Sequence, residues 1–156
     1  MEVKLIKAQA EDAAAIHAMQ TQAFLPLLEK YQDHDTNPAN ETVERTVERI
    51  NQAHADKYII SCSGVAVGAV RVTEKENKKY RVGRIFITPE HQGKGIAQQV
   101  FALIEQIYAD AKSWELDTIM QEARNCYLYE KLGYKRTGET HEINDKLTLC
   151  FYEKEA

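Results

Sequence analysis

Two glycines and a lysine stand within three positions of the stretch PEHQGKGIAQQV, residues 89–100. They follow the apolar run Ile85–Ile87 and precede a run of residues with helical spacing. Glycine lets the backbone bend so that several peptide N–H groups approach one ligand, and a helix N-terminus favours negative charge. Six consecutive residues are therefore candidates to hold a diphosphate through their amides: Gln92, Gly93, Lys94, Gly95, Ile96 and Ala97.

Two other uses of such a loop require residues that are absent here. A nucleoside triphosphate loop needs GxxxxGK followed by Ser or Thr, whereas Gly95 follows Lys94 here. A dinucleotide-binding loop needs GxGxxG, and Gln98 stands at the third glycine position. A diphosphate cradle and a plain strand-to-helix turn both fit the local residues, and in either case the Lys94 side chain can point to solvent.

Two motifs taken together resemble those of the GCN5-related N-acetyltransferases. Residues Gln92–Ala97 match that family's pattern of Gln or Arg, two residues, Gly, one residue, then Gly or Ala, and the usual Thr88-Pro89-Glu90 precedes them. The segment LYEKLGYKRTG at 128–138 resembles the family's second signature. The resemblance extends over essentially the whole chain, and it implies an acetyl-CoA-dependent N-acetyltransferase with acetyl-CoA as cosubstrate.

The resemblance also implies where the cosubstrate would bind. The fourth and fifth strands should splay apart after a bulge, and the pantetheine arm should enter that gap like an added strand. Backbone groups of Ile85, Phe86 and Ile87 would pair with the arm, while the Phe86 side chain packs in the core. A strand N–H near Ile87 could stabilise the charge that builds on the thioester oxygen.

Tyr129 matches the general acid of the family. A phenol has an unperturbed pKa of about 10 and a thiol one of about 8.5, so a tyrosine is protonated at neutral pH and can donate to a forming thiolate. The alternative interpretation is a packed helix tyrosine whose hydroxyl is satisfied elsewhere. A non-catalytic acyl-CoA-binding module is the second function class that the chain allows, and the presence of Tyr129 favours the enzyme.

The chain departs from the family pattern seven residues before Tyr129, where members often carry an asparagine that contacts the pantetheine arm. Glu122 occupies that position, and Asn125 is a substitute candidate. Asn125 could equally help to cap the helix that starts there.

The general base is left open by the sequence. Some family members keep a glutamate on the fourth strand, but Arg84 stands there instead. A carboxylate, a histidine or an ordered water chain can accept the amine proton. The candidates are Asp117, Glu122, His34, His141 and water.

The acceptor should meet two segments in this fold, namely FLPLLEKYQDHDTNPANE (24–41) and THEINDK (140–146). Both are acidic, through Asp33, Asp35, Glu142 and Asp145. This charge favours a small-molecule or peptide amine with extra positive charge, although acidic loops also serve solubility alone. Tyr31 fits either a binding aromatic or a core tyrosine.

The hydrophobic pattern predicts the elements that must position these residues: strand, two helices, three strands, helix, strand, helix and two strands. Pro26 is expected to interrupt or end the first helix, Leu28–Asn40 to form a loop, and Asn40 to cap the second helix. Gly133 is expected to stop the last helix. The result is an α/β (α+β) fold in which a mixed, mostly antiparallel seven-stranded sheet carries helices on both faces, the acyl-CoA N-acyltransferase fold.

Bulk composition limits the remaining function classes. With 156 residues, one domain over 1–156 is expected. A net charge of −4 gives no pull toward nucleic acid, and no apolar run is long enough to span a membrane. Three widely spaced cysteines indicate free thiols in a reducing cytoplasm, with no metal site. The family resemblance is compatible with a homodimer, of which the sequence itself carries no sign.

Overall fold

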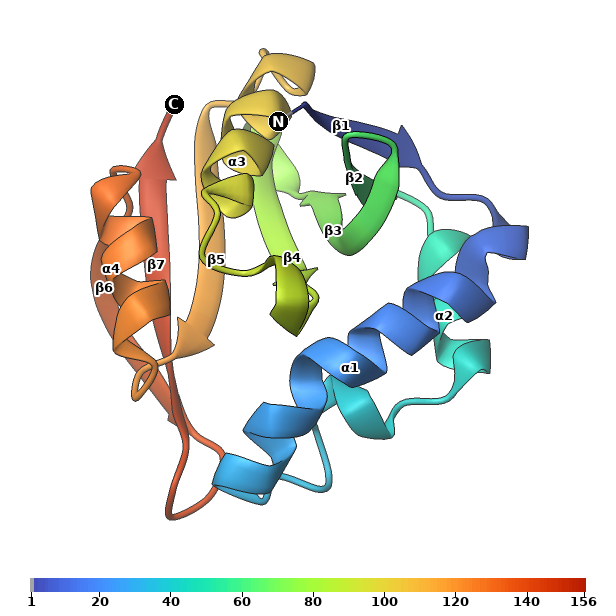
Figure 1. Ribbon diagram of the computed structural model, residues 1–156. Helices are drawn as coiled ribbons and strands as arrows, with labels where there is room; N and C mark the ends of the chain where they lie inside the picture. The colour runs from blue at the N-terminus through green and yellow to red at the C-terminus, as the bar shows by residue number, and fades with distance from the viewer. Residues whose placement is uncertain (1) are drawn as a thin grey trace.

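The computed structural model describes residues 2–156, which form one seven-stranded sheet with the strand order β1-β2-β3-β4-β5-β7-β6 (Figure 1). Neighbouring strands are antiparallel except β4 and β5, which are parallel. The predicted order of elements and the mixed sheet are confirmed. The strands are β1 (Val3–Lys7), β2 (Ala55–Cys62), β3 (Val65–Glu74), β4 (Lys79–Ile87), β5 (Ser113–Ile119), β6 (Lys135–Glu142) and β7 (Thr148–Glu155). The helices are α1 (Ala13–Tyr31), α2 (Val43–Ile50), α3 (Ile96–Ile107) and α4 (Ala123–Lys131).

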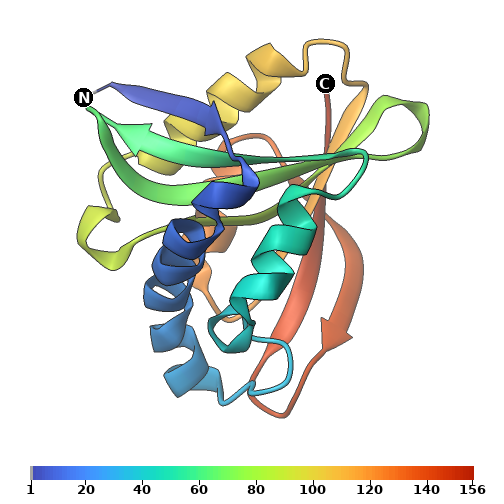
Figure 2. The same cartoon turned by 90° about the vertical axis from the view of Figure 1, so that its right-hand side faces the viewer.

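Helices cover both faces of the sheet, as the sequence predicts. Figure 2 shows α1 and α2 side by side on the near side of the sheet and α3 on the far side. Alternate strand residues point to opposite faces, so each strand contributes to two cores. Val70 packs with Ile104 of α3 in the larger core, whereas its neighbour Ala69 packs with Ile16 of α1 in the smaller one.

Strand β4 carries the irregularity that opens the sheet. Ala69 of β3 pairs with Phe86 and Arg71 pairs with Gly83, so two residues of β4 stand opposite Val70. Arg84 takes a left-handed φ of 49° at this bulge. Beyond it β4 is no longer paired with β5, since the parallel ladder covers only Lys79–Arg81 against 113–115. The expected bulge and splay between the fourth and fifth strands are both present.

Helix α1 differs from the prediction, because it continues through Pro26 to Tyr31. A proline inside a helix removes one hydrogen bond and costs roughly 3 kcal/mol. Leu28 and Tyr31, both buried, lie beyond the proline and pack into the fold, which offsets that cost. The helix ends at Gln32, which takes a left-handed φ of 57°.

Helix termini show one further correction. Asn40 does not cap α2, because it lies in a short 3-10 turn, Pro38–Asn40. Thr42 is the cap, and its hydroxyl accepts a hydrogen bond from the amide of Arg45. Gly133 follows α4 with a φ of 98°, as the sequence predicts for a left-handed stop.

Candidate active site

The gap between β4 and β5 leaves one edge of β4 without a strand partner (Figure 1). In an antiparallel pair the N–H and C=O of one residue point to the same side, and successive residues alternate. The Phe86 carbonyl points toward β3, because a Cβ atom added to Gly68 would collide with it. The backbone groups of Ile85 and Ile87 therefore face the open edge, where an extended ligand can pair with them.

The side chain of Gln92 contacts the same edge. Its amide nitrogen donates to the Ile87 carbonyl oxygen at 2.9 Å. The glutamine thus ties the glycine loop to the end of β4. Sequence reasoning used only the Gln92 backbone and gave its side chain no role.

The glycine loop has the conformation that its residue types require. Gly93 and Gly95 both have a φ of 77°, which disfavours any residue with a Cβ. Gly95 is the N-cap of α3 and offers no capping side chain. The first amides of a helix have no partner within the helix, so those of Ile96 and Ala97 point into the loop and are available to an anion. Lys94 between the two glycines is exposed.

Arg124, at the start of α4, was missed by sequence reasoning. Its Nη2 atom lies 3.7 Å from the point that a Cβ on Gly93 would occupy. An exposed guanidinium beside a loop of free amides adds a second positive group that a diphosphate can meet. Only the folded chain brings α4 to this loop, because Gly93 and Arg124 belong to different motifs.

Tyr129 lies in α4 within a cluster of aromatic rings. Its ring centroid is 5.8 Å from that of Phe101 in α3, 6.1 Å from that of Tyr152 and 6.3 Å from that of Tyr134. Tyr129 is only 7% exposed. Burial first, and then the negative charge of Asp117, raise the pKa of Tyr129 above its usual value. The phenol is therefore protonated at neutral pH and free to donate.

Asn125 and Glu122 stand at the start of α4, where the family pattern is broken. The Asn125 amide donates to the Glu122 carbonyl oxygen at 3.1 Å, and no side chain caps this helix. The Asn125 side chain therefore does not serve as the cap that the sequence allows. It is half-buried in the first turn of α4, on the element that carries Arg124 and Tyr129.

The four side chains that could act as the base have different surroundings. His34 is exposed with its ring against Gln32, and His141 is exposed on the edge strand β6. Asp117, on β5, is ion-paired with Arg81. Glu122 accepts hydrogen bonds from Lys30 at 2.8 Å and from the Tyr31 hydroxyl. Burial works to raise the pKa of Glu122, but the bonds from Lys30 and Tyr31 outweigh it and hold the pKa below its usual range.

The two segments expected to receive the acceptor meet at Tyr31. The Asn144 side chain, in the loop between β6 and β7, donates to the Tyr31 carbonyl oxygen at 3.0 Å. Figures 1 and 2 both place this loop beside the end of α1. Tyr31 is buried and bonded to Glu122, so its ring belongs to the wall of the site. Asp33 is buried as well and accepts from the amide and hydroxyl of Thr36, which ties its charge to a turn.

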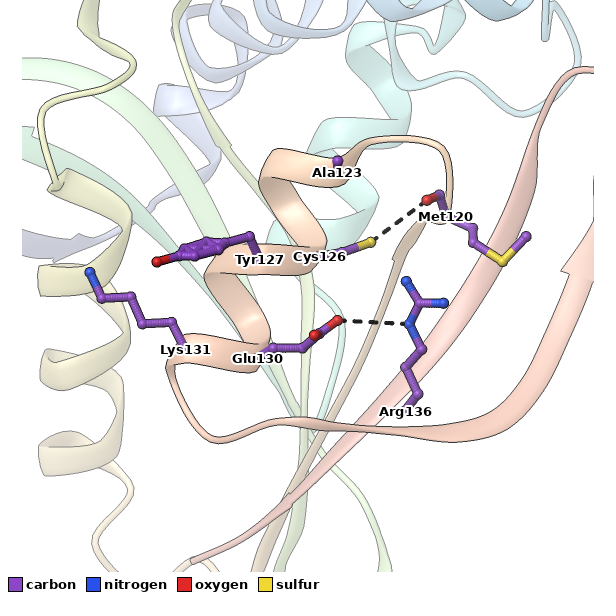
Figure 3. A pocket seen from close by; sticks show the side chains of 7 residues that line it. All are labelled: Met120, Ala123, Cys126, Tyr127, Glu130, Lys131 and Arg136. Carbon is purple, nitrogen blue, oxygen red and sulfur yellow. Dashed lines mark hydrogen bonds and ion pairs between the residues drawn. The ribbon is translucent and has the colours of Figure 1, made fainter.

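A surface hollow with a volume of about 520 Å³ lies beside α4 (Figure 3). Its helix residues are spaced by three or four and share one face, which does not include Tyr129. Glu130, one of these residues, points toward Arg136 of β6 and ion-pairs with it. The hollow is lined by Met120, Ala123, Cys126, Tyr127, Glu130, Lys131 and Arg136. It is separate from the β4–β5 gap and adds nothing to the site.

The described part of the chain holds neither a cluster of metal ligands nor a helix that could span a membrane. Residues 2–156 hold no group of three or more His, Cys, Asp or Glu side chains placed to bind a metal ion. None of the helices in the same range has the length and apolar character that a membrane crossing requires.

Comparisons with known proteins give the same fold. The structure is similar to the spermidine N-acetyltransferase of Vibrio cholerae in complex with CoA and spermine, with a TM-score of 0.77 and 17% identity over 98% of this chain and 95% of that one. It is also similar to the PaiA N-acetyltransferase of Thermoplasma acidophilum in complex with coenzyme A, with a TM-score of 0.77 and 15% identity over 100% of both chains.

Sequence comparison agrees with the structural likeness. The chain is 22% identical over 175 aligned residues to the spermidine N(1)-acetyltransferase of Escherichia coli, covering 97% of this chain and 86% of that protein. A family model described as "Acetyltransferase (GNAT) domain" matches residues 27–155. That match spans most of the sequence, including the open edge of β4, the glycine loop and Tyr129. The chain therefore belongs to the GNAT acetyltransferase family.

Proposed function

We propose that the protein is an acetyl-CoA-dependent N-acetyltransferase that transfers the acetyl group to a primary amine by direct attack. The observation that carries this proposal is a combination of three features: the unpaired edge of β4, the glycine loop that follows it, and the protonated phenol of Tyr129 on α4. A long ligand with a diphosphate near one end and a thioester at the other can use all three.

The amides of residues 92–97 would hold the diphosphate, with Lys94 and Arg124 as cationic neighbours. The backbone groups of Ile85 and Ile87 would pair with the pantetheine arm as an added strand. Phe86 would contribute through its packing on α1 rather than through its carbonyl, which faces β3. Asn125, on the α4 side of the gap, is the proposed polar contact to the arm.

The reaction needs two groups of this chain together with a base or a water chain. The amine must be neutral to attack, so one proton leaves it for a base or a water chain while the carbon–nitrogen bond forms. A β4 amide facing the gap, near Ile87, would stabilise the negative charge on the carbonyl oxygen. As the carbon–sulfur bond breaks, the sulfur keeps the electron pair and takes the Tyr129 proton, which solvent later restores.

The acceptor is proposed to be a small-molecule or peptide amine held between α1 and the β6–β7 loop. Glu122 supports this position, because it touches Tyr31 and stands where β5 leads into α4. Its lowered pKa keeps it as a carboxylate that can orient the amine and pass its proton to water. The names of the spermidine acetyltransferase relatives support an amine as the acceptor class.

Residues 1–156 are proposed to form a single domain of this kind, since the seven strands share one sheet. A cytoplasmic location is proposed on the basis of Cys62, Cys126 and Cys150, which are all free thiols.

A thiol-release assay with acetyl-CoA and a library of primary amines tests the proposed activity, together with calorimetry of acetyl-CoA binding. We expect acetyl-CoA to bind and at least one amine to release CoA, with mass spectrometry finding the acetylated amine. Binding without release for any amine would instead support a non-catalytic acyl-CoA-binding module.

A further inference from the structure

Four cationic side chains surround one carboxylate between the sheet and α2. We call Lys57, Arg49, Arg71 and Arg84 with Glu41 the basic cluster. Arg84 Nη1 lies 2.7 Å from Glu41 Oε1, and Arg49 Nη2 lies 3.3 Å from Glu41 Oε2. Lys57 pairs with Arg71 in the β2–β3 register, and Arg71 in turn pairs with Gly83, the neighbour of Arg84.

The basic cluster lies on the α1–α2 face of the sheet. Lys57 and Arg71 each stand two residues from a member of the small core under α1, namely Ile59 and Ala69. Residues two apart on a strand point to the same face. The glycine loop instead leads into α3, which covers the opposite face, so the cofactor diphosphate does not reach this cluster.

Several donors in the basic cluster have no partner. Lys57 is only 2% exposed and forms no ion pair among residues 2–156. The Lys57 Nζ, Arg49 Nε and Arg71 Nε atoms are buried without a hydrogen-bond acceptor in that range. Burying an unpaired charge is costly, and native proteins leave few polar groups unsatisfied. The cations outnumber the carboxylate by three, so the basic cluster lacks negative charge.

Other charges on this face do not fill the deficit. Glu115 and Asp117 of β5 are already ion-paired with Arg81. Asp33 is bonded to Thr36, as described above. His17 contacts the Glu41 carbonyl oxygen rather than its carboxylate.

The basic cluster borders the β4–β5 gap. Arg84 directly precedes Ile85, and its positive φ at the bulge is a strained conformation for a residue with a side chain. In that conformation the Arg84 side chain is directed toward Glu41. The Arg84 and Arg49 side chains are 19% and 21% exposed, so a ligand can reach their guanidinium groups.

We propose that the basic cluster binds an oxyanion group of the acceptor, so that the substrate is an amine that also carries a carboxylate or a phosphate. The partly exposed Arg84 and Arg49 contact the anion directly. Lys57 and Arg71, on β2 and β3, add positive charge from the sheet. This inference rests on the proposed function and narrows its acceptor. It also replaces the expectation, drawn from the acidic loops, of an amine with extra positive charge.

Matched pairs of acceptors test this inference. β-Alanine and propylamine differ by a carboxylate in place of a methyl group, and O-phosphoethanolamine and ethanolamine differ by a phosphate. Spermidine is included as an acceptor with extra positive charge. We expect kcat/KM to be about tenfold or more higher for the anionic member of at least one pair, as hydrogen bonds to a charged group imply. The pair that shows the effect identifies the oxyanion.

Variants of the basic cluster show whether it is the source of the preference. In Arg84→Gln and in Lys57→Met the ratio of kcat/KM between anionic and neutral members should fall toward one. Lys135→Gln is the control, because this exposed lysine lies on β6, at the other end of the sheet from β2, and the variant should keep the wild-type ratio. Lys57→Met removes a buried unpaired charge at similar length, so it should also raise the melting temperature.

Equal or lower rates for the anionic members in wild-type protein would overturn the inference while leaving acetyl transfer intact. If no amine is acetylated, the proposed function fails and a binding readout decides the anion site. Inorganic phosphate should raise the melting temperature of wild-type protein, relative to chloride at equal ionic strength, and not that of Lys57→Met. Equal shifts in both proteins, or no shift in either, would overturn the anion site.

Discussion

Tyr129 is the single side chain on which the proposed chemistry depends most. Tyr129→Phe keeps the ring among Phe101, Tyr134 and Tyr152, so the aromatic packing and the fold should be retained. Loss of the proton donor should slow acetyl transfer by a factor of about 10² to 10⁴. Calorimetry should give an unchanged acetyl-CoA affinity, and a thiol-release assay should give the lower kcat.

Tyr127→Phe is the matched control, since this tyrosine of the same helix is 64% exposed and lines the hollow beside α4. It should turn over at the wild-type rate. A Tyr129→Phe variant that is as fast as the control would remove Tyr129 from the mechanism.

Lys57 gives the protein a pH dependence of stability. Burial, followed by the charges of Arg84, Arg49 and Arg71, lowers the pKa of Lys57 to about 8 from a usual 10.5. Between these two values the unfolded chain binds a proton that the folded chain does not, so the free energy of unfolding rises with pH. Below about pH 8 both states carry the proton, and the fold bears the full cost of about 3 kcal/mol.

Chemical denaturation of wild type and Lys57→Met isolates this effect from other titrations. The variant should be the more stable protein at pH 7, and its advantage should shrink as the pH rises from about 8 to 10.5. A stability difference that stays constant over that range would mean that Lys57 is neutral or paired in the folded protein.

At the residue scale the sequence predicted the side chains that belong to compact motifs. Gly93, Gly95 and Tyr129 were found because local spacing alone identifies them. Lys57 and Arg124 were not, because their significance comes from partners distant in the chain. In the strand KYIISC, Lys57 resembles an ordinary solvent-facing residue, and only the arrival of α2 buries it.

At the element scale the bulged strand β4 determines the open edge. Gly68 of β3 lies so close to the Phe86 carbonyl that a Cβ there would collide with it. Gly68→Ala should therefore shift β4 beyond the bulge, cost about 1–3 kcal/mol of stability, and weaken acetyl-CoA binding. Denaturation and calorimetry measure the two effects.

Gly83→Ala supplies the comparison on the neighbouring strand, because a Cβ at Gly83 meets nothing within 4 Å. It should leave both stability and acetyl-CoA affinity near wild type. If Gly68→Ala behaves like Gly83→Ala, the edge of β4 is not shaped by that close approach.

The elements themselves could largely be predicted, because alternation in the strands and the apolar stripe of α3 are strong local signals. Helix α3 buries Ile96, Val100 and Ile104 at helical spacing. It also buries Phe101, whereas Ile107 is half exposed. Helix α1 was predicted to stop at Pro26 because proline is a local breaker. The burial of Leu28 and Tyr31 offsets the cost of the proline, so the helix continues. That burial depends on residues distant in the chain, so no local pattern predicts it.

At the scale of the whole molecule, one contact joins the two halves of the acceptor site. The Asn144 amide donates to Tyr31 of α1, while its oxygen accepts from the amides of Lys146 and Leu147. Asn144→Asp still accepts the hydrogen bonds from Lys146 and Leu147, but it can no longer donate to Tyr31. Loss of one hydrogen bond should raise KM for the amine about fivefold and leave acetyl-CoA affinity unchanged.

Steady-state kinetics with the best acceptor measures this change. Asn77→Asp, at the exposed hairpin between β3 and β4, controls for the added negative charge. If both variants have the wild-type KM, the amine does not bind between α1 and the β6–β7 loop.

The distribution of charge illustrates what the sequence could not provide at this scale. The acidic loops favoured a cationic acceptor, yet the fold gathers Lys57, Arg71 and Arg84 on one face from three different strands. Net charge does not show where charges cluster. The positive charge on this face of the sheet can be recognised only once the order of the strands is known.

A crystal structure of the protein with acetyl-CoA tests the central claim most directly. The account predicts a diphosphate within hydrogen-bond distance of the amides of residues 92–97, a pantetheine arm along the edge at Ile85 and Ile87, and a thioester sulfur beside the Tyr129 hydroxyl. Acetyl-CoA bound anywhere else, or a β4–β5 gap that stays empty at saturating acetyl-CoA, would contradict it.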